Sequence, residues 1–337
     1  MKEQKKGTLT LWRIVATFVV VLAMTVVYGC SGGGGGGGGG STGITYTGIT
    51  TQAVIDQNNA EEIAIGSYEG GNISSSLNIV GAISENSISV KQPLALDLTE
   101  SFNGIIDKIE NLVGENTINI GAIETVNETI NGNCTVGGSA SLILSVNDQN
   151  GDFSGSITFN NYCETPPQIT INGNVSLVGN VDLGNESITY FDIDFNKLIA
   201  ESDGESIGIN GSIDMDFDLL SRLTRMAINF VIEDSNLAKT YKYENVVYQY
   251  TYGSNYFSFT ITGRYYDYDY GYVDMTTDTA IKVYAGDILP SEGILILTGD
   301  NGTVAKLIVT NKTSFYVVAD TDGDNIFDDF NSGTLYW

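Results

Sequence analysis

The stretch "SASLILSVNDQNGDFSGSITFNNY", residues 139–162, indicates the fold class. Apolar side chains alternate with small or polar ones in both halves of it, from Ala140 to Val146 and from Phe153 to Phe159. A period of two is typical of β-strands that bury one face. The Asn-Gly-Asp sequence at 150–152 favours a tight turn between the halves. We therefore expect an antiparallel hairpin in this stretch.

The same alternation continues in residues 168–198 and 205–220, which predicts further hairpins. An Ile-Asn-Gly sequence recurs at 130–132, 171–173 and 209–211, at intervals of 41 and 38 residues. Glycine inside a strand often marks a bulge or bend, and repeated bends let a wide sheet curve. Chance recurrence in a chain rich in asparagine and glycine is the alternative explanation.

These patterns predict a mainly β fold, with one large antiparallel meander sheet of roughly ten to fourteen long strands. We expect the sheet to be strongly curved or barrel-like, with one or two short N-terminal helices packed on it. A transmembrane barrel has similar alternating strands. Acidic side chains spread over most of the expected strands argue against a barrel of that kind.

Two segments favour helices. In residues 51–66, Asn58 followed by Glu61 resembles a capping box, and Gly66 can end the helix. In residues 97–113, apolar side chains recur at helical spacing. We expect the second helix to fill the concave side of the sheet or to plug one end. A membrane-surface helix is the alternative, which its four acidic side chains disfavour.

Composition and charge limit the classes of function. The chain of 337 residues is 42% hydrophobic, enough to bury a substantial core. Residues 1–29 hold four of the 15 basic and one of the 41 acidic side chains, so the remainder carries a formal charge near −29. Such a surface repels nucleic acid, so we expect no nucleic-acid partner. Histidine is absent, which removes Ser-His-Asp and Cys-His catalysis.

The N-terminus has the pattern of an export signal. Basic residues precede an apolar run of about 15 residues from Ile14 to Tyr28, which is a signal-peptide length and short for a spanning helix. An uncleaved membrane anchor is the alternative. Nine glycines follow at 32–40, and glycine loses the most backbone entropy on ordering, so we expect them to form a spacer.

The end of the apolar run, Val27-Tyr28-Gly29-Cys30, resembles the lipobox of bacterial lipoproteins. The resemblance implies cleavage before Cys30 and attachment of several acyl chains there, palmitate being one such chain, which together make a stable membrane anchor. Ser31 follows, which in Gram-negative lipoproteins implies the outer membrane, with the leaflet left open. The resulting domain boundaries are 1–29 for the signal peptide, 30–43 for the lipidated cysteine and polyglycine linker, 44–116 for a helical N-terminal segment and 117–337 for an antiparallel β domain.

The other two cysteines, Cys134 and Cys163, flank the first long hairpin. An exported chain meets an oxidising compartment, so we expect them to form a disulfide bond. A free reactive thiol is the less favoured alternative.

Eleven of the 19 tyrosines lie in residues 241–272. By strand alternation one face holds Tyr248, Tyr250 and Tyr252, and another holds Tyr266, Tyr268, Tyr270 and Tyr272. Tyrosine-rich sheet faces can stack on sugars or apolar ligands. Cross-strand aromatic pairing that stabilises the sheet is the favoured interpretation.

The sequence "DTDGDNIFDD" near the C-terminus resembles the calcium loops of thrombospondin type 3 repeats, dockerins and EF-hands. It places Asp320, Asp322, Asp324 and Asp328 at positions 1, 3, 5 and 9 of such a loop. Asn325 stands where those loops carry glycine, and asparagine tolerates the left-handed conformation. The flanks are typical of strands. Calcium binding, expected to be weak, and a solvated hairpin loop are equally supported.

Three functions remain open. The favoured one is a membrane-anchored envelope lipoprotein that acts as a non-enzymatic binding or structural module. The alternatives are a calcium-dependent carbohydrate-binding or adhesion module and a carboxylate- or metal-dependent hydrolase. Residues 46–64 and 298–337 also look like parts of uncharacterised lipoproteins of Gram-negative bacteria. We nominate no catalytic residue.

Overall fold

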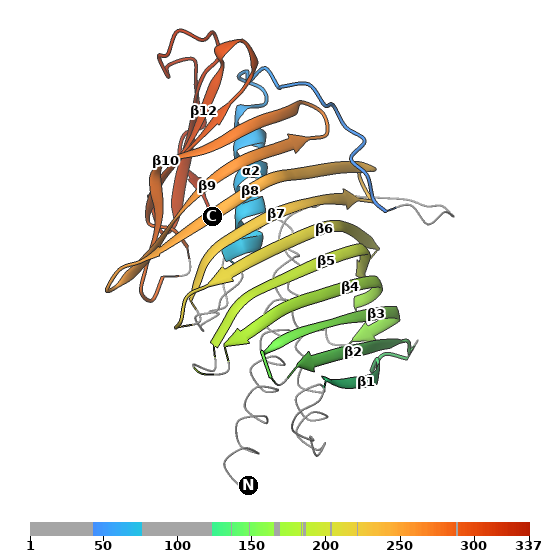
Figure 1. Cartoon of the computed structure of the whole chain (residues 1–337). Helices are drawn as coiled ribbons and strands as arrows, with labels where there is room; N and C mark the ends of the chain where they lie inside the picture. The colour runs from blue at the N-terminus through green and yellow to red at the C-terminus, as the bar shows by residue number, and fades with distance from the viewer. Residues whose placement is uncertain are drawn as a thin grey trace.

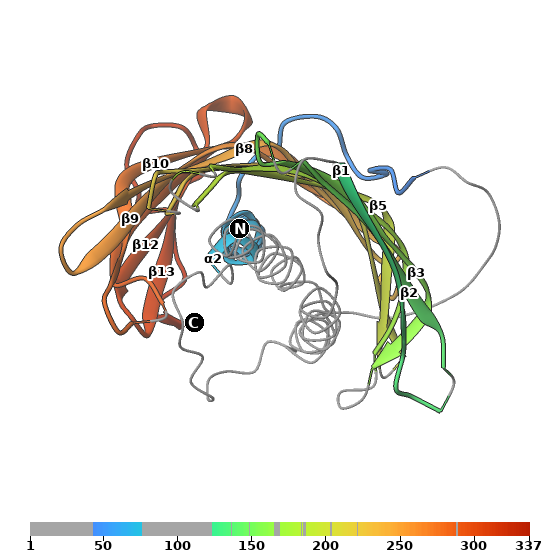
Figure 2. The ribbon, with the colours of Figure 1, turned by 60° about the horizontal axis from the view of Figure 1, so that its bottom comes forward.

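The computed structural model describes residues 43–75 and 123–337, apart from residues 136, 148, 165–168, 183, 185–186, 203, 221 and 288. This part of the chain forms one antiparallel β-sheet with an α-helix, α2 (Ala60–Ser75), on its concave side (Figures 1 and 2). Within these ranges no helix is both long and apolar enough to cross a membrane.

The sheet has 15 strands. In chain order they are β1 (Ile123–Asn131), β2 (Ser139–Asn147), β3 (Asp152–Glu164), β4 (Ile169–Asp182), β5 (Ser187–Ser202), β6 (Glu205–Phe217), β7 (Leu223–Asp234), β8 (Lys239–Tyr252), β9 (Tyr256–Asp267), β10 (Gly271–Tyr284), β11 (Glu292–Thr298), β12 (Val304–Asn311), β13 (Ser314–Asp320), β14 (Phe330–Asn331) and β15 (Leu335–Tyr336). A short 3₁₀ turn, η1 (Asp300–Gly302), joins β11 to β12.

Each strand from β1 to β14 pairs with its sequence neighbours, and β15 pairs with β13. The predicted meander is therefore confirmed, and so is the hairpin at 139–162, in which Val146 pairs with Phe153. The prediction of a strongly curved or barrel-like sheet was wrong: the sheet is neither closed nor strongly curled, and Figure 2 shows an open arch. Closure requires the first and last strands to pair, but β1 and the two-residue β14 stand at opposite ends of the strand order.

The glycines of the second and third Ile-Asn-Gly sequences lie at strand irregularities, as predicted. Gly173 (φ +122°) and Gly211 (φ +133°) have backbone conformations that side chains disfavour. A Cβ atom on Gly173 would lie 2.2 Å from the Lys197 carbonyl oxygen, and one on Gly211 would lie 2.1 Å from that of Asn229. Neighbouring strands therefore approach at these points more closely than any other residue would allow.

The asparagines of the same two sequences hold the bulges on the neighbouring strands. Asn172 Oδ1 accepts the backbone N–H of Asn161 at 2.7 Å, and Asn210 Oδ1 accepts that of Lys197 at 3.2 Å. Asn161 and Lys197 are left-handed, with φ near +50°, inside bulges of β3 and β5. In the first copy, Gly132 instead follows the end of β1.

The helix α2 was predicted in the right region but with different bounds, because it begins at Ala60 and continues past Gly66 to Ser75. Gly66 does not end the helix; it allows the helix to pack closely on the sheet. The Tyr243 hydroxyl donates to the Gly66 carbonyl at 2.9 Å, and a Cβ on Gly66 would lie 2.4 Å from the Tyr265 hydroxyl. The buried side chains Ile63, Ala64 and Tyr68 join the same core as the inward face of the sheet.

Residues 43–56, here called the N-terminal strap, run across the ends of the strands before α2 begins (Figure 1). Thr47 N–H donates to Thr240 Oγ1 on β8 at 2.8 Å, and Ala53 N–H donates to the Tyr272 carbonyl on β10 at 2.8 Å. Farther along, Ile55 N–H donates to Thr303 Oγ1 at 3.0 Å. The strap therefore fixes the start of the described chain to strands far away in sequence.

The predicted disulfide is present between Cys134 and Cys163, whose Cα atoms are 5.5 Å apart. It joins the loop after β1 to the end of β3. The predicted helix at 97–113, the signal peptide, the glycine run and Cys30 lie outside the described residues.

Candidate functional site

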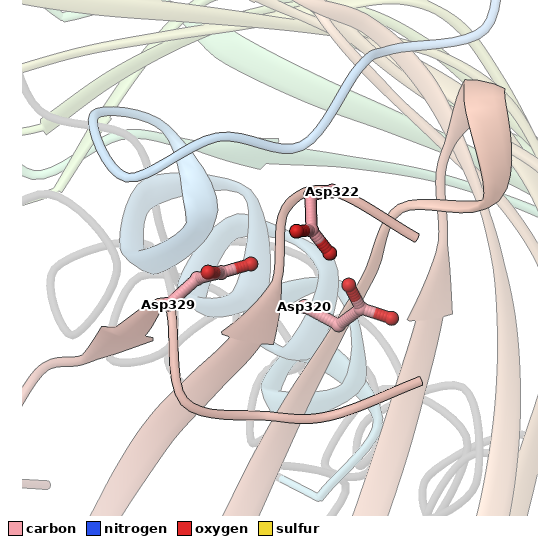
Figure 3. A group of neighbouring side chains, drawn as sticks. All are labelled: Asp320, Asp322 and Asp329. Atoms are coloured by element: carbon pink, nitrogen blue, oxygen red, sulfur yellow. The ribbon is translucent and has the colours of Figure 1, made fainter. Parts of the chain in front are cut away.

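The aspartate-rich loop after β13 brings three carboxylates together (Figure 3). Asp320 ends β13, Asp322 lies in the loop and Asp329 directly precedes β14. One oxygen of each lies within 4.8 Å of the others. Asp320 is fully buried, Asp329 is half-buried and Asp322 is exposed. Three oxygen ligands at this spacing can hold a divalent cation.

Hydrogen bonds from the loop backbone orient these carboxylates. Asp320 accepts the N–H of Gly323 at 2.7 Å and that of Asn325 at 2.8 Å, one on each oxygen. Asp329 Oδ2 accepts both the N–H and the hydroxyl of Thr321, at 2.7 and 3.0 Å. Each carboxylate oxygen has two lone pairs, so these bonds leave capacity for a metal. Asn325 adopts the expected left-handed conformation, with φ +69°.

The electrostatics of the loop favour a cation. The Asp324 N–H donates to Asp322 and favours its charged form, but the negative charge of Asp324, desolvation, and the charges of Asp329 and Asp320 together outweigh this bond and raise the pKa of Asp322. In contrast, the N–H and hydroxyl of Thr321 lower the pKa of Asp329. A bound divalent cation would relieve the repulsion at Asp322.

The sequence-based ligand set and the observed group agree for Asp320 and Asp322 only. Asp324 and Asp328 are exposed and do not belong to the group, which includes Asp329 instead. The reason is hairpin register: Ala319 pairs with Phe330, so the next pair outward is Asp320 with Asp329. Because the flanks of the loop are typical of strands, hairpin register decides which aspartates come together, rather than the numbering of a calcium loop.

The loop lies against the N-terminal strap through η1. A Cβ on Gly323 would be 2.9 Å from the Asn301 carbonyl oxygen, so the loop and η1 are in contact. The adjacent Asp300 N–H donates to the Ala53 carbonyl of the strap at 2.7 Å. Lys306 of β12 lies 3.7 Å from the centre of the Phe327 ring of the loop. The candidate metal group is thus part of a junction between the C-terminal hairpin, η1 and the strap.

The first set of tyrosines packs within the sheet, as the favoured interpretation predicted. Tyr248 is fully buried, and its ring and that of Tyr250 lie 6.1 and 5.7 Å from Phe259. Tyr252 contacts Phe257 at 6.3 Å. These are cross-strand pairs, which stabilise neighbouring strands.

The second set does not share one face, which corrects the alternation-based prediction. The β9–β10 turn lies between its members, so the period of two breaks. Tyr270 donates to Glu62 of α2 at 3.0 Å, whereas Tyr266 contacts Tyr272 at 5.3 Å on the outward face. Tyr268 lies in the turn, and its carbonyl accepts the Ile49 N–H of the strap at 3.1 Å.

The outward tyrosines form a compact cluster with cations. Lys242 lies 4.7 Å from the Tyr266 ring centre, and Arg264 lies 3.8 Å from that of Tyr272. Tyr46 of the strap packs edge-on against Tyr266 at 5.4 Å. Only 7% of Tyr266 is exposed, so its ring is occupied by protein neighbours. This cluster seals the strap to the sheet and leaves little free aromatic surface for a ligand.

The chain matches no protein-family model, no curated protein and no solved structure.

Proposed function

We propose that this protein is a membrane-anchored envelope lipoprotein that acts as a non-enzymatic structural or binding module, with a calcium ion at Asp320, Asp322 and Asp329. The observation that supports the proposal best is the place of this carboxylate group. It adjoins the strap, and the strap leads toward the expected lipid anchor at Cys30. An ion there would strengthen the part of the fold that carries the tether.

Calcium is the ion that best suits the group. Calcium takes six to eight oxygen ligands in flexible geometry, and carboxylates with backbone carbonyls are its usual protein ligands. At an affinity typical of extracellular sites, about 10⁻⁴–10⁻³ M, 5 mM calcium would stabilise the fold by about 1–2 kcal/mol.

Thermal unfolding with 5 mM calcium chloride or with EDTA tests the metal site. We expect calcium to raise the unfolding midpoint of the unsubstituted chain by a few degrees and to leave the midpoint of Asp329→Asn unchanged. Asp328→Asn is the matched control, because Asp328 carries the same charge one residue away but lies outside the group; it should respond like the unsubstituted chain. An equal response of both variants would contradict the ligand assignment, and no response of the unsubstituted chain would contradict the site.

Palmitate labelling in cells tests the anchor separately. The unsubstituted chain should take up the label and Cys30→Ala should not. Uptake by Cys30→Ala would refute lipidation at that residue.

A calcium-dependent carbohydrate-binding or adhesion module is the second candidate. The exposure of Asp322 favours it, because a cation bound there would face solvent and could bind ligand hydroxyl groups at its open positions. Glycan binding that requires calcium and is lost in Asp322→Asn would support this function over a purely structural ion.

A further inference from the structure

The turn between β6 and β7 exposes two leucines. Leu219 is 67% exposed and Leu220 is 72% exposed, more than any other large hydrophobic side chain in the described part of the chain. They follow one another at the tip of the turn, at the end of the sheet opposite to the aspartate loop. Two adjacent leucines in water forgo the free energy that burial would give them.

The turn is held in this conformation by its own polar groups. Asp218 Oδ1 accepts the N–H of Leu220 at 2.8 Å and that of Arg222 at 3.1 Å, and Asp218 Oδ2 pairs with the Arg222 guanidinium at 2.6 Å. The Asp218 N–H donates to the Arg222 carbonyl at 2.9 Å and closes the turn. Arg222 in turn lies 5.0 Å from the Tyr252 ring centre. A turn that is ordered by its own hydrogen bonds and ion pair therefore holds the leucines in solvent.

Ion pairs offset part of the negative charge at this end of the sheet, where Asp192 and Asp214 also lie. Four acids at this end of β6 to β13 each pair with a cation: Asp216 with Arg225, Asp218 with Arg222, Glu292 with Lys282, and Asp287 with Lys312. Tyr256 and Tyr284 both lie beside Lys282, with ring centres 6.0 Å apart. Tyrosine with lysine or arginine around an apolar tip is typical of surfaces at the membrane–water interface.

The position of the strap allows the turn to reach a membrane that holds Cys30. The described chain starts at Gly43, beside Asn210 on β6. From Asn210 to Leu219 is about 30 Å along the strand at the usual rise per residue. The chain from Cys30 to Gly43 can span up to about 45 Å when extended. Both ends can therefore meet one bilayer surface.

We propose that Leu219 and Leu220 insert into the interface of a lipid bilayer and give the tethered domain a second, non-covalent membrane contact. The ion pairs offset part of the acidic charge at this end, and Tyr252, Tyr256 and Tyr284 lie at headgroup level. The reach argument rests on the anchor of the proposed function, whereas the lipid contact of the turn is measurable without it.

Quenching of tryptophan by brominated lipid tests the contact. Leu219→Trp in the full chain is reconstituted with phosphatidylcholine vesicles that carry plain or brominated acyl chains. Leu237→Trp is the matched control, because Leu237 is an exposed leucine in the β7–β8 turn at the other end of the sheet. Trp337 is common to both variants, and so is Trp12 before the expected cleavage of residues 1–29, so emission of the unsubstituted chain is subtracted. We expect the added emission of Leu219→Trp to be quenched at least about twofold more strongly than that of Leu237→Trp.

Equal quenching at the two positions, or none at position 219, would overturn the proposal. Sedimentation of the full chain in detergent provides a second arm. If Leu219→Asp/Leu220→Asp turned a dimer into a monomer, the leucines would bind a second copy and the lipid contact would be refuted. Palmitate labelling tests lipidation at Cys30, and quenching tests the lipid contact of the β6–β7 turn. Failure of one proposal is therefore distinguishable from failure of the other.

Discussion

Replacing Gly66 by alanine tests how closely α2 packs on the sheet. In the interior of an exposed helix this change stabilises by about 1 kcal/mol, because alanine has the higher helix propensity. Here the added Cβ would lie 2.4 Å from the Tyr265 hydroxyl oxygen and 2.9 Å from Cζ of the same ring. Tyr265 is 2% exposed and packs against Tyr243 at 5.1 Å, so it has little room to move.

Overpacking of this kind costs about 1–3 kcal/mol. A displaced helix would also weaken the bond from the Tyr243 hydroxyl to the Gly66 carbonyl, by up to about 1 kcal/mol. Together these costs exceed the gain in propensity, so we expect Gly66→Ala to lower the free energy of unfolding by about 1–2 kcal/mol.

Urea denaturation followed by circular dichroism measures the change. The sign of the change in urea midpoint distinguishes the two effects, because helix propensity alone predicts a higher midpoint and close packing predicts a lower one. Tyr265→Phe removes the clashing oxygen, so Gly66→Ala should cost less in that background than in the unsubstituted chain. A Gly66→Ala protein that unfolds at higher urea than the unsubstituted chain would refute the reasoning.

Two further outcomes are expected. Cys134→Ser/Cys163→Ser should lower the free energy of unfolding by about 3–4 kcal/mol in the loop-entropy model, as measured by urea denaturation. The unsubstituted chain with its disulfide reduced is the control, and its free energy of unfolding should match that of the double variant. Partial burial and neighbouring acids raise the pKa of Asp192, and the pKa of its cross-strand partner Asp214 is raised as well. A carboxyl group whose pKa is raised in the folded state adds stability at low pH, and this stability is lost as pH rises through that pKa. The difference in free energy of unfolding between Asp214→Asn and the unsubstituted chain should therefore shift in favour of Asp214→Asn from about pH 4 upward. A difference that does not change with pH would contradict this.

Local patterns were sufficient to predict the hairpins. Alternation in β2 and β3 reports one buried face, and the Asn150-Gly151 turn fixes their register, so each hairpin depends on neighbouring residues only. The bulge role of Gly173 and Gly211 was predicted from their recurrence in the Ile-Asn-Gly sequence, because glycine inside a strand often marks a bulge. The disulfide followed from the expected compartment together with the cysteines at both ends of one hairpin.

Properties that depend on distant residues were not predictable in this way. Gly66 looked like a helix end because its sequence neighbours do not include Tyr243 and Tyr265, which lie 177 and 199 residues away. Whether the sheet closes depends on the twist accumulated over all strands and on whether its two edges meet. The choice of Asp329 over Asp328 needed the pairing of Ala319 with Phe330, which a loop motif read by spacing alone does not contain.

The N-terminal strap has a consequence for the order of folding. Ile55 and Thr303 are 248 residues apart in the chain, and Tyr68 packs on Trp337 at 4.9 Å. Contacts of such separation form late, because the loop entropy must first be offset by local pairing. The meander can assemble hairpin by hairpin as it is synthesised, but Ile55 and α2 lack part of their binding surface until the last strands exist. The strap near Gly43 can bind β6, β8 and the β9–β10 turn first, whereas Ile55 and α2 are secured last, and a chain that stops short of β12 would lack their contacts with Thr303 and Trp337.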